Sequence, residues 1–324
     1  MANILVAPSS LDGIDGDFVH VLKKAGHQLV FHKKGEQLNE EEIIHWLGKV
    51  DAVLAGSEPY SAKVLQTAPK LKAIARVGVG YDAVDLNAAT ANKTIVTITP
   101  GTNHGAVAEH AFCLILALAK KLVVQHKAME AGKFPRGTNF PVRGKVLGIA
   151  GLGRAGKALA TRALAFEMKV IAFEPFPDQE FLKKHSIPLV SLDEILGQSD
   201  YLSLHMPYSK ESHHFINKNT LAKMKPTAFV VNTSRGGVIN TVDLQEALEK
   251  GVIAGAGLDV FEIEPPGKLP IFSSEKVVLT PHEAGVDIQS RDDMALSAAH
   301  ALIDIFNGRW PEDKVVNKEL KDRL

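Results

Sequence analysis

Three charged side chains follow short, mostly apolar runs near the end of the chain. Arg235 follows residues 228–234, Glu264 follows residues 256–261, and His282 follows residues 277–281. Runs of this length are typical of buried strands, and ligands of open α/β sheets bind beyond the carboxyl ends of the strands. Taken singly, each residue fits a solvated loop. As a set they can do chemistry: the imidazole can exchange a proton, the carboxylate can orient it, and the guanidinium can bind a substrate carboxylate.

A glycine-rich turn lies upstream of these residues. Gly151, Gly153 and Gly156 form a G-x-G-x-x-G pattern that follows the apolar run 146–150 and opens a predicted helix over 154–166. In this context Gly151 permits the turn, Gly153 lets the backbone approach a pyrophosphate, and Gly156 allows close packing of helix and strand. The pattern predicts a dinucleotide site.

Glu174 ends the next predicted strand and favours NAD over NADP. Its carboxylate can accept hydrogen bonds from the adenosine ribose, whereas it would repel a 2′-phosphate. No Lys or Arg follows it before Lys183 to offset that repulsion. A nicotinamide cofactor beside Arg235, Glu264 and His282 suits reversible hydride transfer between a 2-hydroxy acid and a 2-keto acid.

The elements that must position these groups alternate along the whole chain, which indicates parallel sheets with crossover helices. We expect strands at 4–7, 28–31, 52–55, 73–77, 95–98, 146–150, 170–173, 189–190, 201–204, 228–232, 255–260 and 277–280. Helices are expected at 17–25, 40–47, 61–68, 85–91, 154–166, 242–250 and 290–306. One long helix over about 103–129 is expected to be buried, with a loop over 132–144.

Composition narrows the class of protein. The 324 residues carry 37 basic and 37 acidic side chains, a balance that argues against nucleic-acid and membrane-surface binding. The one cysteine, Cys113, is expected to be a small buried hydrophobe, and its isolation fits a reducing compartment. The N-terminus lacks a signal-type segment, so we expect a cytoplasmic protein. The 13 histidines show no metal-ligand spacing, and no metal is expected.

Seven segments together resemble the D-isomer-specific 2-hydroxyacid dehydrogenase family over nearly the whole chain. They are Ala75–Asp82, Pro100–Glu109, Gly144–Gly156, Leu204–Pro207, Val231–Gly237, Gly257–Pro266 and Thr280–His282. The resemblance assigns the catalytic roles to Arg235, Glu264 and His282, and it selects Glu264 over Glu262 because Glu264 immediately precedes Pro265-Pro266.

The resemblance also implies binding residues. Arg154 and Ala155 would lie on the pyrophosphate, Met206 and Pro207 near the adenosine, and Thr233 and Asp259 near the nicotinamide carboxamide. The cofactor-binding residues implied or inferred are Val77, Gly151, Gly153, Arg154, Ala155, Gly156, Glu174, Met206, Pro207, Thr233, Asp259, His282 and Gly285. The backbone of Val79 and Gly80 would bind the substrate carboxylate together with Arg235, and Asn103 would belong to the same cleft.

The fold implied by the resemblance is α/β, with two doubly wound parallel-sheet domains. A Rossmann NAD-binding domain (residues 101–285) would be inserted into a flavodoxin-like substrate domain (residues 1–100 plus 286–324). Members of the family typically form homodimers through their NAD-binding domains, and the implied partner molecule is a small 2-hydroxy or 2-keto acid.

Two departures bear on the substrate. Phosphoglycerate dehydrogenases usually have an arginine after the third strand, where this chain has Gly56-Ser57-Glu58-Pro59, and the regulatory domain common in that branch is not expected here. Glu58, Arg76 and Tyr81 are expected to line the substrate pocket, and Glu283 adds an acid beside His282. Both departures weaken 3-phosphoglycerate as the substrate. The alternatives to a general D-2-hydroxyacid dehydrogenase are a 3-phosphoglycerate dehydrogenase, a glyoxylate or hydroxypyruvate reductase, or an NAD-sensing binding module like the corepressors of the family.

Overall fold

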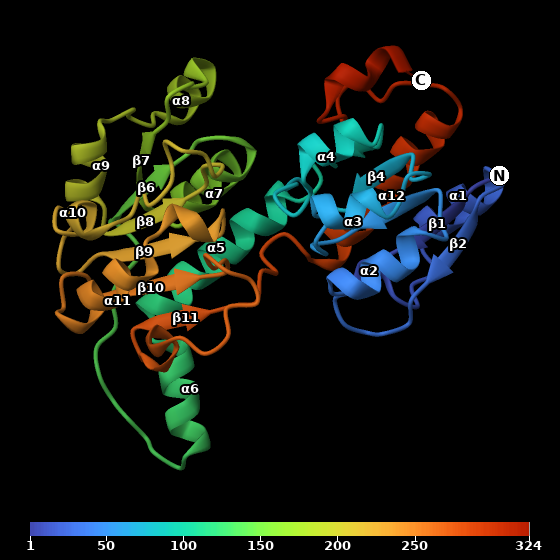
Figure 1. The fold of residues 1–324 in the computed structure, drawn as a ribbon. Helices are drawn as coiled ribbons and strands as arrows, with labels where there is room; N and C mark the ends of the chain where they lie inside the picture. Colours follow the sequence, from blue (N-terminus) through green and yellow to red (C-terminus); the bar gives the residue numbers. More distant parts are fainter. Residues whose placement is uncertain (324) are drawn as a thin grey trace. The chain divides into compact units, whose positions relative to one another are not determined.

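The computed structural model describes residues 1–323 and divides the chain into two compact units. Unit 1 comprises residues 1–103 together with the chain from residue 286 onward, and unit 2 comprises residues 104–285 (Figure 1). The sequence placed the two junctions at 100/101 and 285/286. The α/β class with two parallel sheets, predicted from the alternation of elements, is confirmed.

The sheet of unit 1 has five strands in the order β2-β1-β3-β4-β5, and every pair is parallel. This is the flavodoxin-like order. The strands are β1 (Asn3–Val6), β2 (Gln28–Phe31), β3 (Ala52–Ala55), β4 (Ala73–Arg76) and β5 (Ile95–Thr97).

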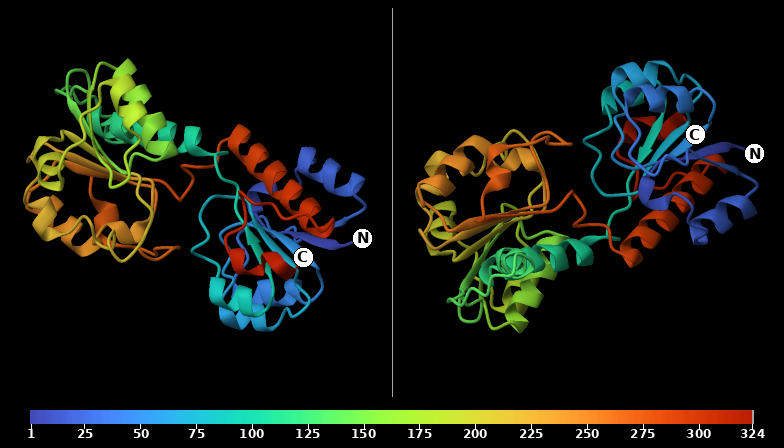
Figure 2. Two further views of the ribbon diagram at one scale, coloured as in Figure 1. Left: turned by 90° about the horizontal axis from the view of Figure 1, so that it is seen from above. Right: turned by 90° about the horizontal axis from the view of Figure 1, so that it is seen from below.

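Helices cover both faces of this sheet (Figure 2) because successive strand side chains point to opposite sides. Ile4 and Val6 of β1 pack in one core with α1 and α12, whereas Leu5 packs in the other with α2 and α3. The helices are α1 (Asp17–Lys24), α2 (Glu40–Leu47), α3 (Ala62–Gln66), α4 (Leu86–Ala91) and α12 (Ile288–Phe306), with short 3-10 turns at Ser9–Leu11 and Lys318–Arg323.

The sheet of unit 2 has six parallel strands in the order β11-β10-β9-β8-β6-β7. They are β6 (Val146–Ala150), β7 (Lys169–Phe173), β8 (Tyr201–Leu204), β9 (Phe229–Asn232), β10 (Gly255–Leu258) and β11 (Val277–Leu279). The prediction of a strand at 189–190 is wrong. Leu189 makes only an isolated parallel bridge to Ala172 of β7, so it stands where the third strand of a Rossmann sheet would pair.

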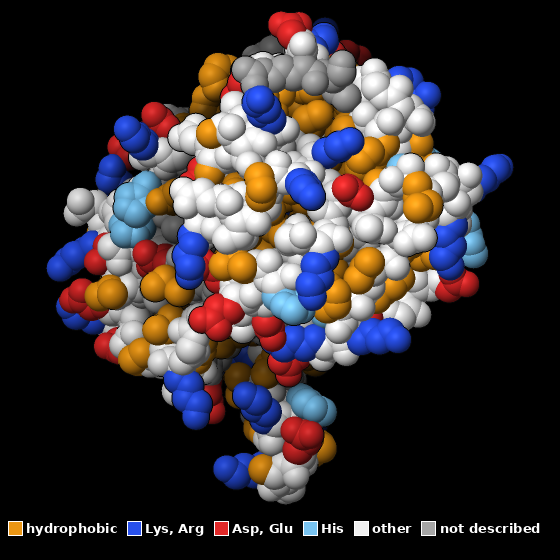
Figure 3. All heavy atoms as spheres, turned by 45° about the vertical axis from the view of Figure 1, so that its right-hand side comes forward, with side chains coloured by type: hydrophobic (Ala, Val, Ile, Leu, Met, Phe, Trp, Pro, Cys, Tyr) orange, Lys and Arg blue, Asp and Glu red, His pale blue; other side chains and the backbone are white. Residues whose placement is uncertain are grey.

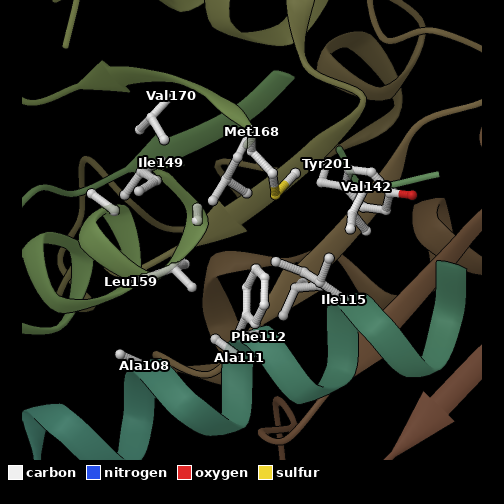
Figure 4. Packing of buried hydrophobic residues seen from close by; sticks show 14 of the residues in the cluster. Ala108, Ala111, Phe112, Ile115, Val142, Ile149, Leu159, Met168, Val170 and Tyr201 are labelled. Atoms are coloured by element: carbon white, nitrogen blue, oxygen red, sulfur yellow. The ribbon is translucent and has the colours of Figure 1, made fainter. Parts of the chain in front are cut away.

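The helices of unit 2 also lie on both faces of their sheet. They are α5 (His104–Ala119), α6 (Leu122–Glu130), α7 (Arg154–Ala165), α8 (Gln179–His185), α9 (Leu192–Gln198), α10 (Lys218–Leu221) and α11 (Thr241–Glu249), with 3-10 turns at Gly236–Val238 and Pro270–Ser273. Figure 4 shows Ala108, Phe112 and Ile115 of α5 pointing toward Leu159 of α7 and the strand side chains behind it. Within residues 1–323 no helix has the length and apolarity needed to cross a membrane.

The single helix expected over 103–129 is wrong. Lys121 adopts a left-handed conformation with φ 51°, which ends α5 and starts α6 in a new direction. The apolar stretch of α5 is buried, but α6 contains no buried residue. The expectation that Cys113 is buried is also wrong, because it lies on the exposed side of α5.

Candidate active site

The three charged residues singled out in the sequence follow three adjacent parallel strands of unit 2. Arg235 comes after β9, Glu264 comes after β10, and His282 comes after β11. The carboxyl ends of parallel strands share one edge of the sheet, which is where open α/β sheets bind ligands. The fold therefore gathers the cation, the acid and the titratable base of unit 2 along a single edge.

Glu264 and His282 form a close pair. The Oε2 atom of Glu264 lies 2.6 Å from Nδ1 of His282, and Oε1 accepts a 2.9 Å hydrogen bond from the amide of Phe261. Burial raises the pKa of Glu264, but the hydrogen bond and charge of His282, the Phe261 amide and the charge of Arg235 together hold it below its ordinary value. An ionised carboxylate only accepts hydrogen bonds, so Nδ1 carries a proton and Nε2 is left to exchange one.

The backbone at His282 is held in the left-handed region, with φ 58°. Its amide donates to the carbonyl oxygen of Asp259 at 2.8 Å. The next two amides, those of Glu283 and Ala284, donate to the Asp259 carboxylate at 2.9 Å each. Asp259, which is completely buried, therefore fixes the turn that carries the histidine.

A further network continues from Asp259 into α5. The Thr280 hydroxyl donates to Oδ1 of Asp259 at 2.6 Å, and Nε2 of His110 lies 2.9 Å from the Thr280 oxygen. Sequence reasoning missed both Thr280 and His110 as site residues. The Thr280-Pro281-His282 segment carried a signal for the threonine, whereas nothing in the sequence spacing links a histidine on α5 to the end of β11.

The loop that carries Arg235 is fixed by its own side chains and by a close backbone approach. Buried Asn232 donates from Nδ2 to the Arg235 carbonyl at 2.9 Å and accepts from Ser234. A Cβ atom on Gly236 would lie 1.8 Å from the carbonyl carbon of Phe261, so only glycine allows this contact. The contact joins the Arg235 loop to the segment that carries Glu264.

The glycine turn after β6 has the geometry expected of a phosphate loop. Gly151 has φ 96°, and a Cβ there would meet the main chain of His205 at 2.7 Å. A Cβ on Gly153 would meet nothing within 4 Å, so space is open in front of this residue, which caps α7 without a side-chain hydrogen bond. The first amides of α7, at Arg154, Ala155 and Gly156, donate to no main-chain acceptor within residues 1–323. Such a helix end favours an anion, so these residues fit a dinucleotide pyrophosphate.

Glu174, which follows β7, accepts hydrogen bonds from two main-chain amides. Its Oε2 accepts a 2.7 Å hydrogen bond from the amide of Leu152, and its Oε1 accepts one of 2.9 Å from the amide of Phe176. The side chain is partly exposed, and each carboxylate oxygen has a further lone pair for a ribose hydroxyl. Glu174 thus braces the phosphate loop at Leu152.

The other residues of unit 2 that the sequence predicts as cofactor contacts follow strands of the same sheet. Met206 is half-buried and Pro207 exposed after β8, and Gly285 is the last residue of the unit. The hydroxyl oxygen of Thr233, after β9, is buried and has no hydrogen-bond partner among residues 1–323. An orphaned hydroxyl here fits a polar group such as the nicotinamide carboxamide. The Asp259 carboxylate, by contrast, already accepts three hydrogen bonds from this chain.

The loop after β4 in unit 1 presents a run of main-chain amides. The amides of Gly78, Val79 and Gly80 donate to no acceptor among the described residues, and Val79 is exposed. Arg76 donates from Nε to the carbonyl of Gly80 at 2.8 Å, which fixes the loop. Val77 is half-buried at the start of this loop. Asn103, the last residue of this part of unit 1, is also half-buried.

The expected pocket role of Glu58 and Arg76 is not what the structure shows. Glu58 is 1% exposed and Arg76 is 8% exposed, so neither charge is open to solvent, whereas Tyr81 is exposed. Glu58 turns inward because the amide of Gly56 and the hydroxyl of Tyr60 donate to its Oε2. Glu283 has an exposed side chain and contributes its amide to Asp259.

Comparison with known proteins gives a consistent family. Residues 112–284 match the model for the NAD-binding domain of D-isomer specific 2-hydroxyacid dehydrogenases. A glyoxylate reductase of Korarchaeum cryptofilum is 39% identical over 290 residues, which cover 87% of each chain. A D-3-phosphoglycerate dehydrogenase of Archaeoglobus fulgidus is 37% identical over 275 residues, which cover 84% of this chain and 52% of that protein.

A solved structure shows the same fold. The D-lactate dehydrogenase of Aquifex aeolicus, crystallised with NAD and lactic acid, superposes with a TM-score of 0.83 at 26% identity, covering 97% of this chain and 99% of that one. NAD is thus the cofactor that the phosphate loop, Glu174 and the matched domain support. Because the model of this NAD-binding domain matches over half of the chain and a relative is 39% identical over 87% of each chain, the chain belongs to the D-isomer specific 2-hydroxyacid dehydrogenase family.

Proposed function

We propose that the protein interconverts small D-2-hydroxy acids and their 2-keto acids, with His282 as the acid and base. The observation that carries this proposal is the 2.6 Å contact between Glu264 and Nδ1 of His282. In the direction of reduction, protonated Nε2 donates its proton to the carbonyl oxygen of the substrate, and in oxidation neutral Nε2 takes the hydroxyl proton. Ionised Glu264 stabilises the imidazolium that exists on one side of this exchange.

Arg235 and the loop after β4 are proposed to bind the substrate. The guanidinium of Arg235 would hold the carboxylate and polarise the adjacent keto group. The amides of Gly78, Val79 and Gly80 form a receptor that suits a carboxylate oxygen. Asn103 is proposed as an additional polar contact for the same ligand.

Most of the residues proposed to hold NAD belong to unit 2. The amides at the start of α7 (Arg154, Ala155, Gly156) and the open face of Gly153 suit the pyrophosphate. Glu174 suits a ribose hydroxyl, and the orphaned Thr233 hydroxyl suits the carboxamide. Further contacts are proposed for Val77, Met206, Pro207 and Gly285. Bound there, the oxidised cofactor would accept a hydride and its reduced form would supply one, while His282 exchanges the accompanying proton.

Glyoxylate and hydroxypyruvate are the substrates we favour. The glyoxylate reductase relative is 39% identical to this chain over 290 residues, and the D-3-phosphoglycerate dehydrogenase relative is 37% identical over 275 residues. The loop after β3 also offers no outward cation, since Gly56-Ser57-Glu58 stands there and Glu58 is buried. A phosphorylated substrate therefore lacks a receptor at this position.

A panel of 2-keto acids with NADH tests the proposal by the loss of NADH absorbance. We expect the highest kcat/KM with glyoxylate or hydroxypyruvate, lower values with pyruvate, and the lowest with 3-phosphohydroxypyruvate. Tight NADH binding without turnover of any acid would instead support an NAD-sensing binding module.

The His282→Ala variant tests the assignment of the proton donor. We expect turnover to fall by about 10²- to 10⁴-fold, the contribution typical of a positioned acid–base group, while NADH still binds. His126→Ala is the matched control, because His126 lies on α6 with 69% of its side chain exposed. Equal activity of His282→Ala and the control would refute the assignment.

We also propose a homodimer formed through unit 2. An apolar groove of about 580 Å³ between α5, α6 and α7 is lined by Phe112, Cys113, Leu116, Leu122 and Phe166 among others. Figure 3 shows hydrophobic and charged side chains side by side on the exposed α6 segment, where Leu122 and Met129 are more than half exposed. Light scattering should give twice the chain mass, and Leu116→Glu should reduce it to one chain.

A further inference from the structure

His110 is a partly buried histidine of α5 that the proposed chemistry does not use. Its side chain is 25% exposed, and it belongs to the same unit as Asp259, Thr280 and His282. Its Nε2 atom lies 2.9 Å from the Thr280 oxygen and 3.6 Å from Oδ1 of Asp259. The ring therefore lies at the far end of the network that fixes the turn of His282.

Close packing of α5 on the sheet brings His110 to this position. The helix packs against β9, β10 and β11, and a Cβ on Gly257 of β10 would lie 3.1 Å from the Cβ of Leu114. His110 lies one turn before Leu114, on the same face of α5 and about 6 Å away along the helix axis. Asp259 is the second residue after Gly257, about 7 Å further along the strand direction. Because these two steps match, His110 lies beside the end of β10.

The hydrogen bonds of this network run in one direction. The Thr280 hydroxyl has a single hydrogen, which it donates to Oδ1 of Asp259 at 2.6 Å. Toward His110 the Thr280 oxygen can then only accept, so Nε2 of His110 carries a proton. The same Oδ1 accepts from the amide of Glu283, the residue that follows His282. A continuous path of hydrogen bonds thus leads from the His110 ring to the turn.

The proton on Nε2 of His110 determines where the Thr280 hydroxyl points. A hydroxyl hydrogen rotates about its C–O bond to suit its neighbours. A donor at His110 occupies a lone pair of the oxygen and leaves the hydrogen aimed at Asp259. Without that donor the hydroxyl is free to turn away, and the carboxylate that holds the Glu283 and Ala284 amides loses its third partner.

We propose that His110 is a positioning residue for His282. It orients the Thr280 hydroxyl toward Asp259, and Asp259 fixes the left-handed turn that carries the proton donor. His110 acts through these two residues and exchanges no proton with the substrate. This inference rests on the proposed role of His282 as the acid and base.

Nitrogen NMR of protein labelled at histidine tests the direction of the hydrogen bonds without any turnover. A ring nitrogen with a proton and one with a lone pair have clearly different shifts, and the signals of His110 are those missing from the spectrum of His110→Gln. We expect a proton on Nε2 in the wild type. In Thr280→Val, which lacks the hydroxyl, we expect a larger share of the form with the proton on Nδ1. A lone pair on Nε2 in the wild type would overturn the proposal.

The kinetics of His110→Leu test the consequence for His282. We expect kcat to fall about tenfold, the effect of one lost hydrogen bond, with a smaller change in KM. His110→Gln keeps an N–H donor and should retain kcat within about threefold of the wild type. His126→Leu is the matched control, because it makes the same replacement on α6, where no residue is buried. Equal kcat in the two His110 variants would refute the positioning role.

Thr280 provides a second test of the same path. Thr280→Val removes the hydroxyl at nearly unchanged size and should lower kcat about tenfold, whereas Thr280→Ser keeps the hydroxyl and should lower it less. Because His110 acts through that hydroxyl, adding His110→Leu to Thr280→Val should lower kcat no further. Two effects that multiply in the double variant would contradict the proposed path.

These measurements separate the proposal from the proposed function. If the wild type reduces no 2-keto acid, the proposed function fails, and the NMR measurement still decides whether His110 orients Thr280. If the wild type is active but His110→Leu has the same kcat as His126→Leu, only the role of His110 fails. Should His110→Leu not fold, as judged by circular dichroism, equal kcat in Thr280→Val and Thr280→Ser would still overturn the proposal.

Discussion

The main-chain amide of His282 donates a 2.8 Å hydrogen bond to the carbonyl oxygen of Asp259. A residue after β10 thus fixes the left-handed turn that follows β11. The Asp259 carboxylate strengthens the link, because it is completely buried and accepts hydrogen bonds from Thr280, Glu283 and Ala284. The position of the proposed proton donor therefore depends on an acid that does not contact its ring.

Replacing Asp259 with Asn should weaken this turn. One of the two carboxylate oxygens would become an NH₂ group that faces an N–H or O–H donor. Losing a buried charge-assisted hydrogen bond in this way should lower the free energy of unfolding by about 2–3 kcal/mol. We expect a lower unfolding midpoint and a lower kcat with a smaller change in KM. Thermal denaturation and steady-state kinetics measure the two effects. A variant with wild-type stability would show that the carboxylate is not needed to hold the turn.

Glu264→Gln should lower kcat/KM by about 10²-fold or more, because a neutral amide cannot stabilise the imidazolium or fix its tautomer. Since its pKa lies below the ordinary value, wild-type Glu264 should remain ionised until the pH falls below the usual range of a glutamate.

Glu262→Gln is the matched control for that variant. Glu262 lies two residues away, but it contacts Nε2 of His214 at 3.0 Å and the amide of Thr241 at 2.8 Å. We expect its kcat/KM to stay near that of the wild type. If kcat/KM fell in Glu262→Gln and stayed near the wild-type value in Glu264→Gln, the catalytic role would belong to Glu262.

Glu174→Ser should change both the choice and the strength of cofactor binding. Removing the carboxylate relieves repulsion of a 2′-phosphate, so the ratio of kcat/KM with NADPH to that with NADH should rise about 10- to 100-fold. NADH should also bind more weakly, because the Leu152 amide loses its hydrogen bond to Glu174 and this bond holds the phosphate loop in place. Glu180→Ser, an exposed acid on α8, is the control. An unchanged ratio would argue against contact between Glu174 and the ribose.

The sequence predicted the elements that position the site because parallel strands leave a direct signal. Apolar runs such as 146–150 and 201–204 coincide with β6 and β8 to the residue. The strand at 189–190 was too short to form a ladder, so it became a bridge. The left-handed backbone of Lys121 divides the helix predicted over 103–129. Neither the residue type lysine nor the spacing of the apolar residues around it indicates such a conformation.

The interior polar contacts could not be predicted in the same way. Glu58 is a charged residue in a loop, a pattern that favours exposure, and only the Gly56 amide and the Tyr60 hydroxyl turn it inward. The family resemblance implies that Asp259 lies near the nicotinamide carboxamide, but the sequence gives no sign that its carboxylate also accepts from two backbone amides, because every residue possesses an amide. Sequence reasoning finds side chains at strand ends, but it does not find the amides that they meet.

Stability should fall in mild acid because of His205. Burial lowers the pKa of this histidine from 6.5 to about 4. The unfolded chain therefore binds the proton more readily than the folded one between these values, so the stabilisation is complete above about pH 6.5 and is lost as the pH falls toward 4. The expected loss in the free energy of unfolding is about 1–3 kcal/mol.

The His205→Gln variant should flatten this dependence. Glutamine does not titrate, and it keeps a polar group near the Ser203 hydroxyl, which lies 2.9 Å from Nε2 of His205. Urea unfolding of both proteins between about pH 4 and 8 measures the difference, with exposed His300 replaced as the control. The His205 backbone packs against Gly151 of the phosphate loop. We therefore expect NADH binding to weaken over the same pH range in which the free energy of unfolding falls. Parallel profiles for the wild type and His205→Gln would assign the acid sensitivity to another group.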